Sequence, residues 1–338
     1  MSASVTQPVA APTQEELARA GEILDRVSES FGRSVVGQER LRSALLITLL
    51  AEGHALLESV PGLAKTLAAS TLSKTVAAHF TRIQCTPDLL PSDIIGTQVY
   101  DPRNHEFETQ LGPVHANFVL LDEINRSSAK TQSAMLEAMQ ERQTSIAGVV
   151  HPLPRPFMVL ATQNPIEEEG TYVLPHAQMD RFLLKEIVTY PSEAEEMVVL
   201  ERFESGAIGP AHVDGAPVAS TADVVWLQDL VRRVYVDPAI KNYIVRLVQA
   251  SRTVGTLLGP QLGAYVEVGA SPRATLAFFQ ASRAAALLQG RNYVTPDDVR
   301  DLRHSVLRHR IHLSFEALAE RVQPETIIDA LVRTVPSP

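Results

Sequence analysis

The sequence ALLESVPGLAKT, residues 55–66, leads a short apolar run into a loop that ends in lysine and threonine. Phosphate-binding loops follow a strand, precede a helix and have the pattern Gly, four residues, Gly, Lys, then Ser or Thr. Lys65 and Thr66 match this pattern, whereas Ser59 and Ala64 occupy the two glycine positions. These residues alone leave two alternatives open, a phosphate-binding loop and an ordinary strand-to-helix turn.

A helix that begins at about Lys65 gives the loop the context that phosphate binding needs. Backbone N–H groups and the positive end of the helix dipole would hold phosphates, Lys65 would bring a charge to the outer phosphates, and Thr66 would ligate Mg²⁺. The candidate nucleotide-binding residues of this stretch are Ser59, Val60, Pro61, Gly62, Leu63, Ala64, Lys65, Thr66 and Leu67.

The two missing glycines matter only where the backbone needs a positive φ angle. We expect Ala64 to need none, because the helix has already started there. Ser59 lies at the exit of the strand, and we expect the loss of glycine to be less favourable there than at position 64.

Two further strand ends supply polar side chains. The apolar run in NFVLLDEINR, residues 117–126, ends in Asp122 and Glu123, and the run FMVLA, residues 157–161, leads to Asn164. Ligand sites of α/β proteins form at the carboxyl ends of strands. There Asp122 would hold Mg²⁺ through water, Glu123 would orient and deprotonate the attacking water, and Asn164 would hold the water or the γ-phosphate. For the acidic pair the alternative is a solvated turn, which the nearby lysine loop disfavours. For Asn164 the alternative is an ordinary Asn-Pro turn, which Asn164 by itself would favour.

The order of the elements predicts the fold class. Short apolar runs alternate with helical segments in the first part of the chain, which favours a mostly parallel α/β sheet covered on both faces. These runs are 54–58, 82–85, 118–121, 157–161 and 186–189. The predicted division is a mobile tail over 1–12, an α/β core over 13–191 and an all-helical domain over 192–338. Helix starts are predicted at Thr13, Ser192, Asp237, Ser271 and Thr295.

Composition excludes several classes of protein. A formal net charge of −9 and a pI near 5.6 argue against a chain whose main task is to wrap nucleic acid. The longest apolar stretch, Leu45 to Leu50, is too short to cross a membrane. The start of the chain lacks the features of a signal peptide, and one cysteine, Cys85, allows no internal disulfide. We therefore expect a soluble, cytoplasmic protein.

Six stretches, taken together, resemble one family. VVGQ, SVPGLAKT, CTPDLLPSDIIGT, LLDEINRSSAKTQSAMLEAMQER, ATQNPIEEEGTYVLPHAQMDRF and GASPRA occur in the order found in the MoxR family of AAA+ ATPases. The resemblance covers residues from about Arg33 to the end of the chain. It implies a P-loop αβα core with a five-stranded, mostly parallel sheet, an all-helical lid, and a ring, commonly a hexamer, with ATP between neighbouring subunits.

The resemblance also assigns residues outside the strands. It implies that Val36, Gly37 and Gln38 border the adenine. Arg181, in QMDRF, is similar to an arginine finger that reaches the γ-phosphate of the neighbouring subunit, a role that stabilises transition-state charge. Arg273, in the first turn of a lid helix, would contact the γ-phosphate from the lid.

Two insertions and two departures also follow from the comparison with the family pattern. Residues 96–111 and 144–154 resemble β-hairpins that project from the ring and contact clients. The family often carries Ala at position 64, whereas Ser59 replaces its usual glycine, a change that bears on nucleotide affinity. His176 stands where the family usually has Glu, and this residue bears on the support of Arg181.

The resemblance implies a Mg²⁺-dependent ATPase with a chaperone-like role in remodelling, maturing or inserting cofactors into protein complexes, beside partners with von Willebrand factor A domains. Two alternatives remain. One is a nucleotide-gated scaffold with little turnover, and the other is a magnesium-chelatase ATPase subunit, which shares the hairpin insertions. The close match around LLDEINRSSAKTQSAMLEAMQER favours MoxR.

Three histidines, His304, His309 and His312, lie in or beside a basic stretch. Their spacing fits no standard zinc pattern. We expect a solvated face of the lid rather than a metal site.

Overall fold

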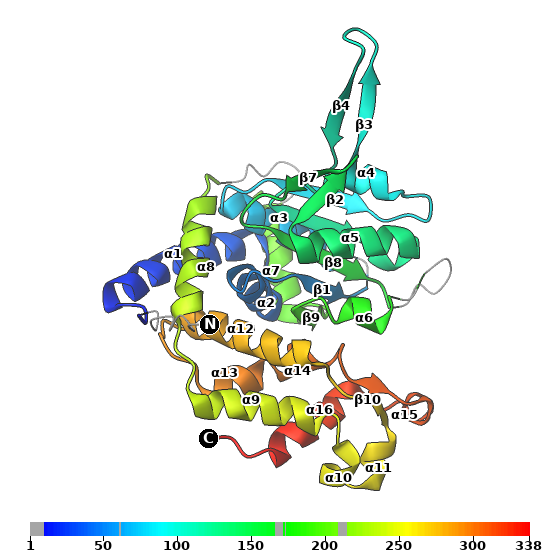
Figure 1. The fold of residues 1–338 in the computed structure, drawn as a ribbon. Helices are drawn as coiled ribbons and strands as arrows, with labels where there is room; N and C mark the ends of the chain where they lie inside the picture. The colour runs from blue at the N-terminus through cyan, green and yellow to red at the C-terminus, as the bar shows by residue number, and fades with distance from the viewer. Residues whose placement is uncertain (1–9, 61, 166–171, 173, 209–214) are drawn as a thin grey trace, which may run out of the picture.

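The computed structural model describes residues 10–60, 62–165, 172, 174–208 and 215–338. Its centre is a five-stranded sheet with the order β2-β5-β8-β1-β9, in which every neighbouring pair is parallel (Figure 1). The strands are β1 (Ala55–Glu58), β2 (Phe80–Gln84), β5 (Phe118–Asp122), β8 (Met158–Gln163) and β9 (Leu184–Ile187). The predicted parallel α/β sheet is confirmed.

Strand β5 shows why helices cover both faces of this sheet. All of its residues are buried, and successive side chains point to opposite faces. Phe118 and Leu120 belong to a hydrophobic cluster shared with α1 (Gln14–Ser34), α2 (Glu39–Leu50) and α3 (Lys65–Thr75). Val119 and Leu121 belong to a second cluster, which includes residues of α4 (Pro91–Ile95) and α5 (Ala129–Glu141).

The predicted helix starts are confirmed, because Thr13, Ser192, Asp237, Ser271 and Thr295 are the N-cap residues of α1, α7, α9, α12 and α13. The remaining bounds are α6 (His176–Met179), α7 (Glu193–Glu204), α8 (Thr221–Arg233), α9 (Pro238–Ala250), α10 (Val254–Leu258), α11 (Pro260–Ala264), α12 (Pro272–Leu288), α13 (Pro296–Asp301), α14 (Arg303–Leu307), α15 (Phe315–Ala319), α16 (Pro324–Thr334) and the 3₁₀ turn η1 (Ile124–Arg126).

The second part of the chain is not entirely helical. Strands β10 (Val266–Val268) and β11 (His312–Leu313) form a short antiparallel pair. The pair joins the segment before α12 to the segment after α14. The pair therefore holds these two segments together at one end of the lid. The helical patterns of the sequence did not predict these strands.

Two hairpins leave the core. Strands β3 (Gly96–Asp101) and β4 (Glu106–Leu111) form a long antiparallel hairpin that projects far from the sheet (Figure 1). Strands β6 (Gln143–Ile146) and β7 (Val149–Pro152) form a shorter one.

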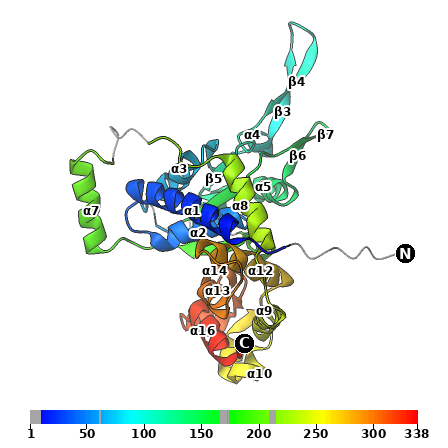
Figure 2. The ribbon, with the colours of Figure 1, turned by 90° about the vertical axis from the view of Figure 1, so that its left-hand side faces the viewer.

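The segment between core and lid contains two helices with different surroundings. Helix α8 packs on α2, where the Gln228 Nε2 donates to the Leu49 carbonyl oxygen at 2.7 Å, and Arg233 at its end pairs with Glu16 of α1 at 2.6 Å. Helix α7 has no buried residue and lies at one side of the chain (Figure 2), where the Arg202 Nη1 donates to the Gly32 carbonyl oxygen at 2.7 Å. Helix α8, part of the predicted lid region, therefore packs on core helices as well as on α12.

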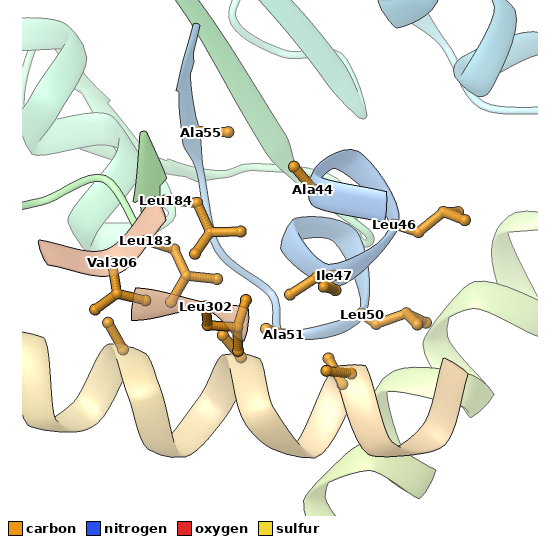
Figure 3. Close-up of a cluster of buried hydrophobic side chains, with 14 of the residues drawn as sticks. Ala44, Leu46, Ile47, Leu50, Ala51, Ala55, Leu183, Leu184, Leu302 and Val306 are labelled. Carbon is orange, nitrogen blue, oxygen red and sulfur yellow. The ribbon is translucent and has the colours of Figure 1, made fainter. Parts of the chain in front are cut away.

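The lid proper is attached beneath the amino end of β1. Helix α12 packs on the end of α2, close to Leu50 and Ala51, while Leu302 and Val306 of the lid meet Leu183 beside β9 (Figure 3). All of these side chains belong to one continuous hydrophobic cluster that also reaches α1 and α3. Core and lid therefore share a common interior.

The buried His54 makes the stability of this core depend on pH. Its Nδ1 accepts a hydrogen bond from the Val159 N–H at 3.0 Å, so its Nε2 donates to the Met139 carbonyl oxygen at 3.1 Å. Burial lowers the pKa of His54 from 6.5 to about 4. The folded protein therefore holds this ring neutral at a pH where the unfolded chain would protonate it.

The free energy of unfolding is expected to fall on acidification from pH 6.5 to about pH 4. In this window the unfolded chain binds a proton at His54 that the folded chain does not, so the stability present above pH 6.5 is lost by up to about 1.4 kcal/mol per pH unit. Denaturant unfolding at several pH values measures the slope. His54→Gln, which cannot titrate, should have a shallower slope, and equal slopes would contradict this account.

Candidate functional site

The phosphate-loop candidate follows β1 and runs directly into α3, as predicted. Ala64 is the N-cap of α3 and has a φ of 54°, so the expectation that it needs no positive φ is wrong. An alanine in this conformation costs roughly 1–2 kcal/mol. Ser59 lies outside the positive-φ region, donates its N–H to the Gln163 carbonyl oxygen at 3.1 Å and is buried. The loss of glycine is therefore less favourable at position 64 than at position 59.

The start of α3 is suited to an anion. The helix has no acidic residue in its first turn and no side-chain cap, so its first N–H groups point outward at the positive end of the dipole. The Lys65 Nζ lies over the loop, 3.2 Å from the Ser59 carbonyl oxygen. Thr66 and Leu67 follow on the partly exposed side, Gly62 has a φ of 86°, and Val60 and Leu63 complete the described loop. Pro61 lies outside the described residues.

Asp122 is held at the carboxyl end of β5 from both sides. Its Oδ2 accepts from the Arg82 Nη2 of β2 at 2.6 Å, and its Oδ1 accepts from the Thr162 Oγ1 of β8 at 2.7 Å. Its side chain is only 13% exposed. The carboxylate therefore has a fixed orientation, set by the two neighbouring strands.

Glu123 has a left-handed backbone, with a φ of 58°. Its N–H donates to the same Thr162 Oγ1 at 2.8 Å, and its Oε2 accepts from the Gln84 Nε2 and the Arg126 Nη1, each at 3.2 Å. Unfavourable backbone angles persist where surrounding contacts enforce them, often at functional sites. The neighbours of Glu123 thus hold its carboxylate between Gln84 of β2 and Arg126 of η1.

Sequence reasoning missed Arg82, Gln84, Thr162 and Arg126, which support the two acidic residues. A signal existed for the first two, because residues two apart on a strand share a face. Arg82 and Gln84 are exposed and flank the buried Ile83 of β2. Using this signal required knowing that β2 lies next to β5.

Asn164 completes this edge of the sheet. It directly follows β8, is buried, and comes after Gln163, which pairs in register with Glu58 of β1. The structure therefore brings Asn164, the lysine loop, Asp122 and Glu123 to one edge, as the sequence predicted.

The Val36–Gln38 turn lies between α1 and α2. Gly37 has a φ of 63°, and a Cβ built there would come within 2.6 Å of the Glu195 carboxylate at the start of α7. Gln38 also has a positive φ, and its Nε2 donates to the Thr189 carbonyl oxygen at 2.9 Å, just after β9. The turn therefore adjoins the exit of β9, at the same carboxyl edge of the sheet.

Arg181 and Arg273 lie together at the other end of the strands. Both line a pocket of about 340 Å³ that also includes Glu52 and Gly53, which precede β1. Because a strand rises about 3.3 Å per residue, the loop at Ser59 is about 20 Å from this pocket. Arg273, expected at the γ-phosphate, thus does not reach the loop of its own chain in this arrangement.

The pocket has a strongly basic wall. Arg142 and Arg310 line it with the two exposed arginines, and Glu52 pairs with Arg142 at 2.8 Å. Among the described residues no ion pair involves Arg181, and the adjacent Asp180 pairs with Arg310 instead, at 2.8 Å. Arg181 is exposed at the mouth of this pocket.

Two family models match the chain. The one described as "ATPase family associated with various cellular activities (AAA)" matches residues 54–184, and an AAA lid domain matches residues 263–331. Chaperone MoxR1 of Mycobacterium tuberculosis is 47% identical, over 96% of this chain and 85% of its own length. The chain belongs to the MoxR family of AAA+ ATPases. Membership of an ATPase family implies that the core binds nucleotide.

Other relatives agree with this assignment. Protein MoxR of Paracoccus denitrificans is 32% identical over 90% of this chain and 93% of its own. A crystal structure of a Cytophaga hutchinsonii protein, described as a candidate ATPase, superposes with a TM-score of 0.89 at 41% identity and covers 96% of this chain and 97% of that one. The fold, an AAA+ α/β core followed by a lid, is thereby shown.

The three histidines of the lid do not all lie on a solvated face. His304 pairs with Asp329 at 2.9 Å, but His309 is buried, with its Nε2 3.2 Å from the Phe182 carbonyl oxygen. The ring of His312 lies 3.5 Å from that of His176, centroid to centroid. The predicted solvated face is therefore wrong for His309, which packs against the core.

Within the described ranges, no three His, Cys, Asp or Glu side chains gather as a metal site, and no helix there could span a membrane.

Proposed function

We propose that this protein hydrolyses ATP with Mg²⁺ in a ring of identical subunits and uses the energy for chaperone-like work on protein complexes. One observation carries the proposal. The lysine loop with the acidic pair lies at one edge of the sheet, and Arg181 with Arg273 lies at the opposite edge. Each chain thus presents two halves of an ATPase site that only a second chain can bring together.

The residues at the carboxyl edge fit ATP and Mg²⁺. Thr66 and Asp122 provide the oxygen ligands that Mg²⁺ prefers, and a bound Mg²⁺ would offset phosphate charge in the transition state. Glu123 would accept the proton of the attacking water, while Asn164 would orient that water by hydrogen bonding. Lys65 would exchange its contacts with the loop carbonyls for contacts with the phosphates.

The edge of the sheet that carries Arg181 and Arg273 would complete the ATPase site of a neighbouring subunit. Two guanidinium groups directed at the γ-phosphate of the next subunit would stabilise the charge that develops as the bond to the leaving phosphate breaks. We infer that both Arg181 and Arg273 act in this way on the neighbour's nucleotide. Val36, Gly37 and Gln38, near the exit of β9, would border the adenine.

Helix α7 supports assembly. Met197, Leu200 and Phe203 recur every third residue along α7, and their exposed fractions are 58%, 64% and 61%. The helix also carries acidic residues in its first turn. Figure 2 shows α7 on one side of the chain and α12 toward the other, where the exposed Leu276 lies beside the arginine pocket. An acidic, apolar side and a basic, apolar side are complementary, as head-to-tail ring closure requires.

Leu200→Asp is expected to weaken assembly about ten- to a hundredfold. The substitution puts a charge into an apolar contact worth about 1.5–3 kcal/mol, and each 1.4 kcal/mol is a factor of ten in affinity. Sedimentation velocity with ATP measures the assembly. Leu318→Asp, an equally exposed leucine on α15, is the matched control. If both variants assemble like the wild type, α7 does not lie in the ring contact.

The long hairpin is the proposed client contact. The rings of Tyr100 and Phe107 contact each other at a tilt of 59°, with centroids 5.4 Å apart, and Val99 and Phe107 are 47% and 66% exposed. Exposed aromatic groups on a projecting element favour contact with another protein. The client would be a protein, with partners bearing von Willebrand factor A domains as the candidates, and not a nucleic acid. A cytoplasmic location is part of this proposal.

The experiment that tests the proposal is steady-state ATP hydrolysis, with and without Mg²⁺, over a wide range of protein concentration. Specific activity that rises with concentration supports a site completed by a neighbour. Tight ATP binding with assembly and no turnover would overturn the proposal in favour of a nucleotide-gated scaffold. Turnover seen only with magnesium-chelatase subunits would assign the chain to that group of ATPases.

A further inference from the structure

We propose that Asp180 fixes Arg181 and Arg273 as one preformed unit by linking the arginine finger segment to the first turn of α12. This inference rests on the proposed function, because it concerns how the two arginines reach a neighbour's nucleotide. It assigns Asp180, Ser271 and Arg310 as positioning residues, which act through Arg181 and Arg273.

The carboxylate of Asp180 joins core and lid directly. Its Oδ2 accepts a hydrogen bond from the Ser271 Oγ at 2.6 Å. The same Ser271 Oγ accepts from the N–H of Arg273 at 3.0 Å and so caps α12. Two hydrogen bonds therefore connect the residue before Arg181 to the backbone of Arg273.

Arg310 of the lid holds the other oxygen and the main chain around the finger. Its Nε donates to the Asp180 Oδ1 at 2.8 Å. Its Nη2 donates to the Phe182 carbonyl oxygen at 2.6 Å, and its Nη1 donates to the Leu183 carbonyl oxygen at 3.2 Å. Contacts on both sides of Arg181 thus leave the finger side chain free while its backbone is fixed.

The buried guanidinium group of Arg310 requires Asp180 as its counter-charge. Arg310 is 3% exposed, and burial lowers its pKa to about 10, while the negative charge of Asp180 opposes that shift. A buried guanidinium needs both a counter-charge and acceptors for its N–H groups. Asp180 supplies the counter-charge, so the carboxylate cannot turn toward Arg181 without leaving Arg310 unpaired. The finger is therefore not neutralised by the acidic residue next to it.

Charge explains why such a link is needed. Arg181 and Arg273 are both positive and share one pocket, so they repel each other until an anionic ligand arrives. A rigid support placed in advance reduces the rearrangement needed when the neighbour's γ-phosphate enters. The link thus makes the lid arginine and the core arginine act together.

The test uses Asp180→Asn and Ser271→Ala, with Ser271→Thr as the conservative control. We expect ATP affinity, measured with a fluorescent ATP analogue, to stay within about twofold, because the lysine loop is unchanged. We expect kcat to fall about ten- to a hundredfold in the first two variants and to recover in Ser271→Thr, in line with the effect of small misplacements of catalytic groups.

Mixing of subunits separates positioning from stability. Asp180→Asn chains mixed with Glu123→Gln chains should regain activity, because an intact Glu123 then meets intact arginines of the partner. Asp180→Asn mixed with Arg181→Ala should not, because no site then has both halves. Equal results in the two mixtures would overturn the inference.

Hydrogen exchange of the nucleotide-free chain gives a second measurement that needs no turnover. Asp180→Asn should raise exchange at 180–183 and at 271–274 together, while unchanged exchange in both segments would overturn the inference. An inactive wild type, or an Arg181→Ala variant with full activity, would instead count against the proposed function. Wild-type kcat in Asp180→Asn, with Arg181→Ala inactive, would count against the link alone.

Discussion

Glu123→Gln is expected to reduce ATP turnover by about a hundred- to ten-thousandfold, the usual effect of losing a general base. Glutamine keeps the size of the side chain and can still contact the Gln84 amide and Arg126, so the fold and the ATP affinity should persist. What is lost is the negative charge that takes a proton from water. Steady-state hydrolysis and equilibrium ATP binding, measured in parallel, separate the two properties.

The matched control for this substitution is Glu137→Gln, an exposed glutamate on α5. It makes the same chemical change elsewhere in the core and should keep wild-type turnover. If Glu123→Gln also keeps it, Glu123 is not the base, and the left-handed backbone at that position needs another explanation.

Arg181→Ala is expected to have an effect of comparable or greater size, because arginine fingers contribute about a thousand- to a hundred-thousandfold in phosphoryl transfer. The loss should fall on kcat, with ATP still bound by the lysine loop of the same chain. Arg246→Ala, an exposed arginine of α9, provides the control for removing a surface charge.

Because Arg181 lies at the edge of the sheet opposite the lysine loop, it should act on the site of a neighbouring subunit, and mixing two inactive variants tests this. Arg181→Ala chains and Glu123→Gln chains, each inactive alone, should regain part of the activity when mixed before assembly. In mixed rings some sites combine an intact Glu123 with an intact Arg181 of the neighbour. A mixture that stays inactive, in rings shown to contain both variants, would mean that Arg181 does not act on the neighbour's site.

Much of the fold could be predicted from sequence because its signals are local. Buried strands such as 118–122 appear as apolar runs, and caps such as Ser192 with Glu195 mark helix starts without knowledge of the tertiary structure. The acidic pair and Asn164 could be placed at one edge because parallel strands end on the same side.

The rest of the site depends on distant contacts. The support of Asp122 by Arg82 and Thr162 follows from the order of strands, which periodicity does not reveal. The positive φ of Ala64 was misjudged, because the angle is set by how the loop joins α3 rather than by the residue type. The burial of His309 and the place of Arg273 both depend on where the lid attaches to the core, and no local pattern encodes that attachment.

The shared interior of core and lid has a mechanical consequence. Opening the seam around Leu183, Leu302 and Val306 would expose apolar side chains at roughly 1.5–3 kcal/mol for each large residue. Swinging the lid within one chain is therefore a costly way to use ATP. In the proposed ring, the contacts between chains would open more easily than this interior, and the nucleotide would lie in those contacts. Each subunit would then move as a stiff unit when one site hydrolyses ATP, and we expect neighbouring sites to act in sequence rather than independently.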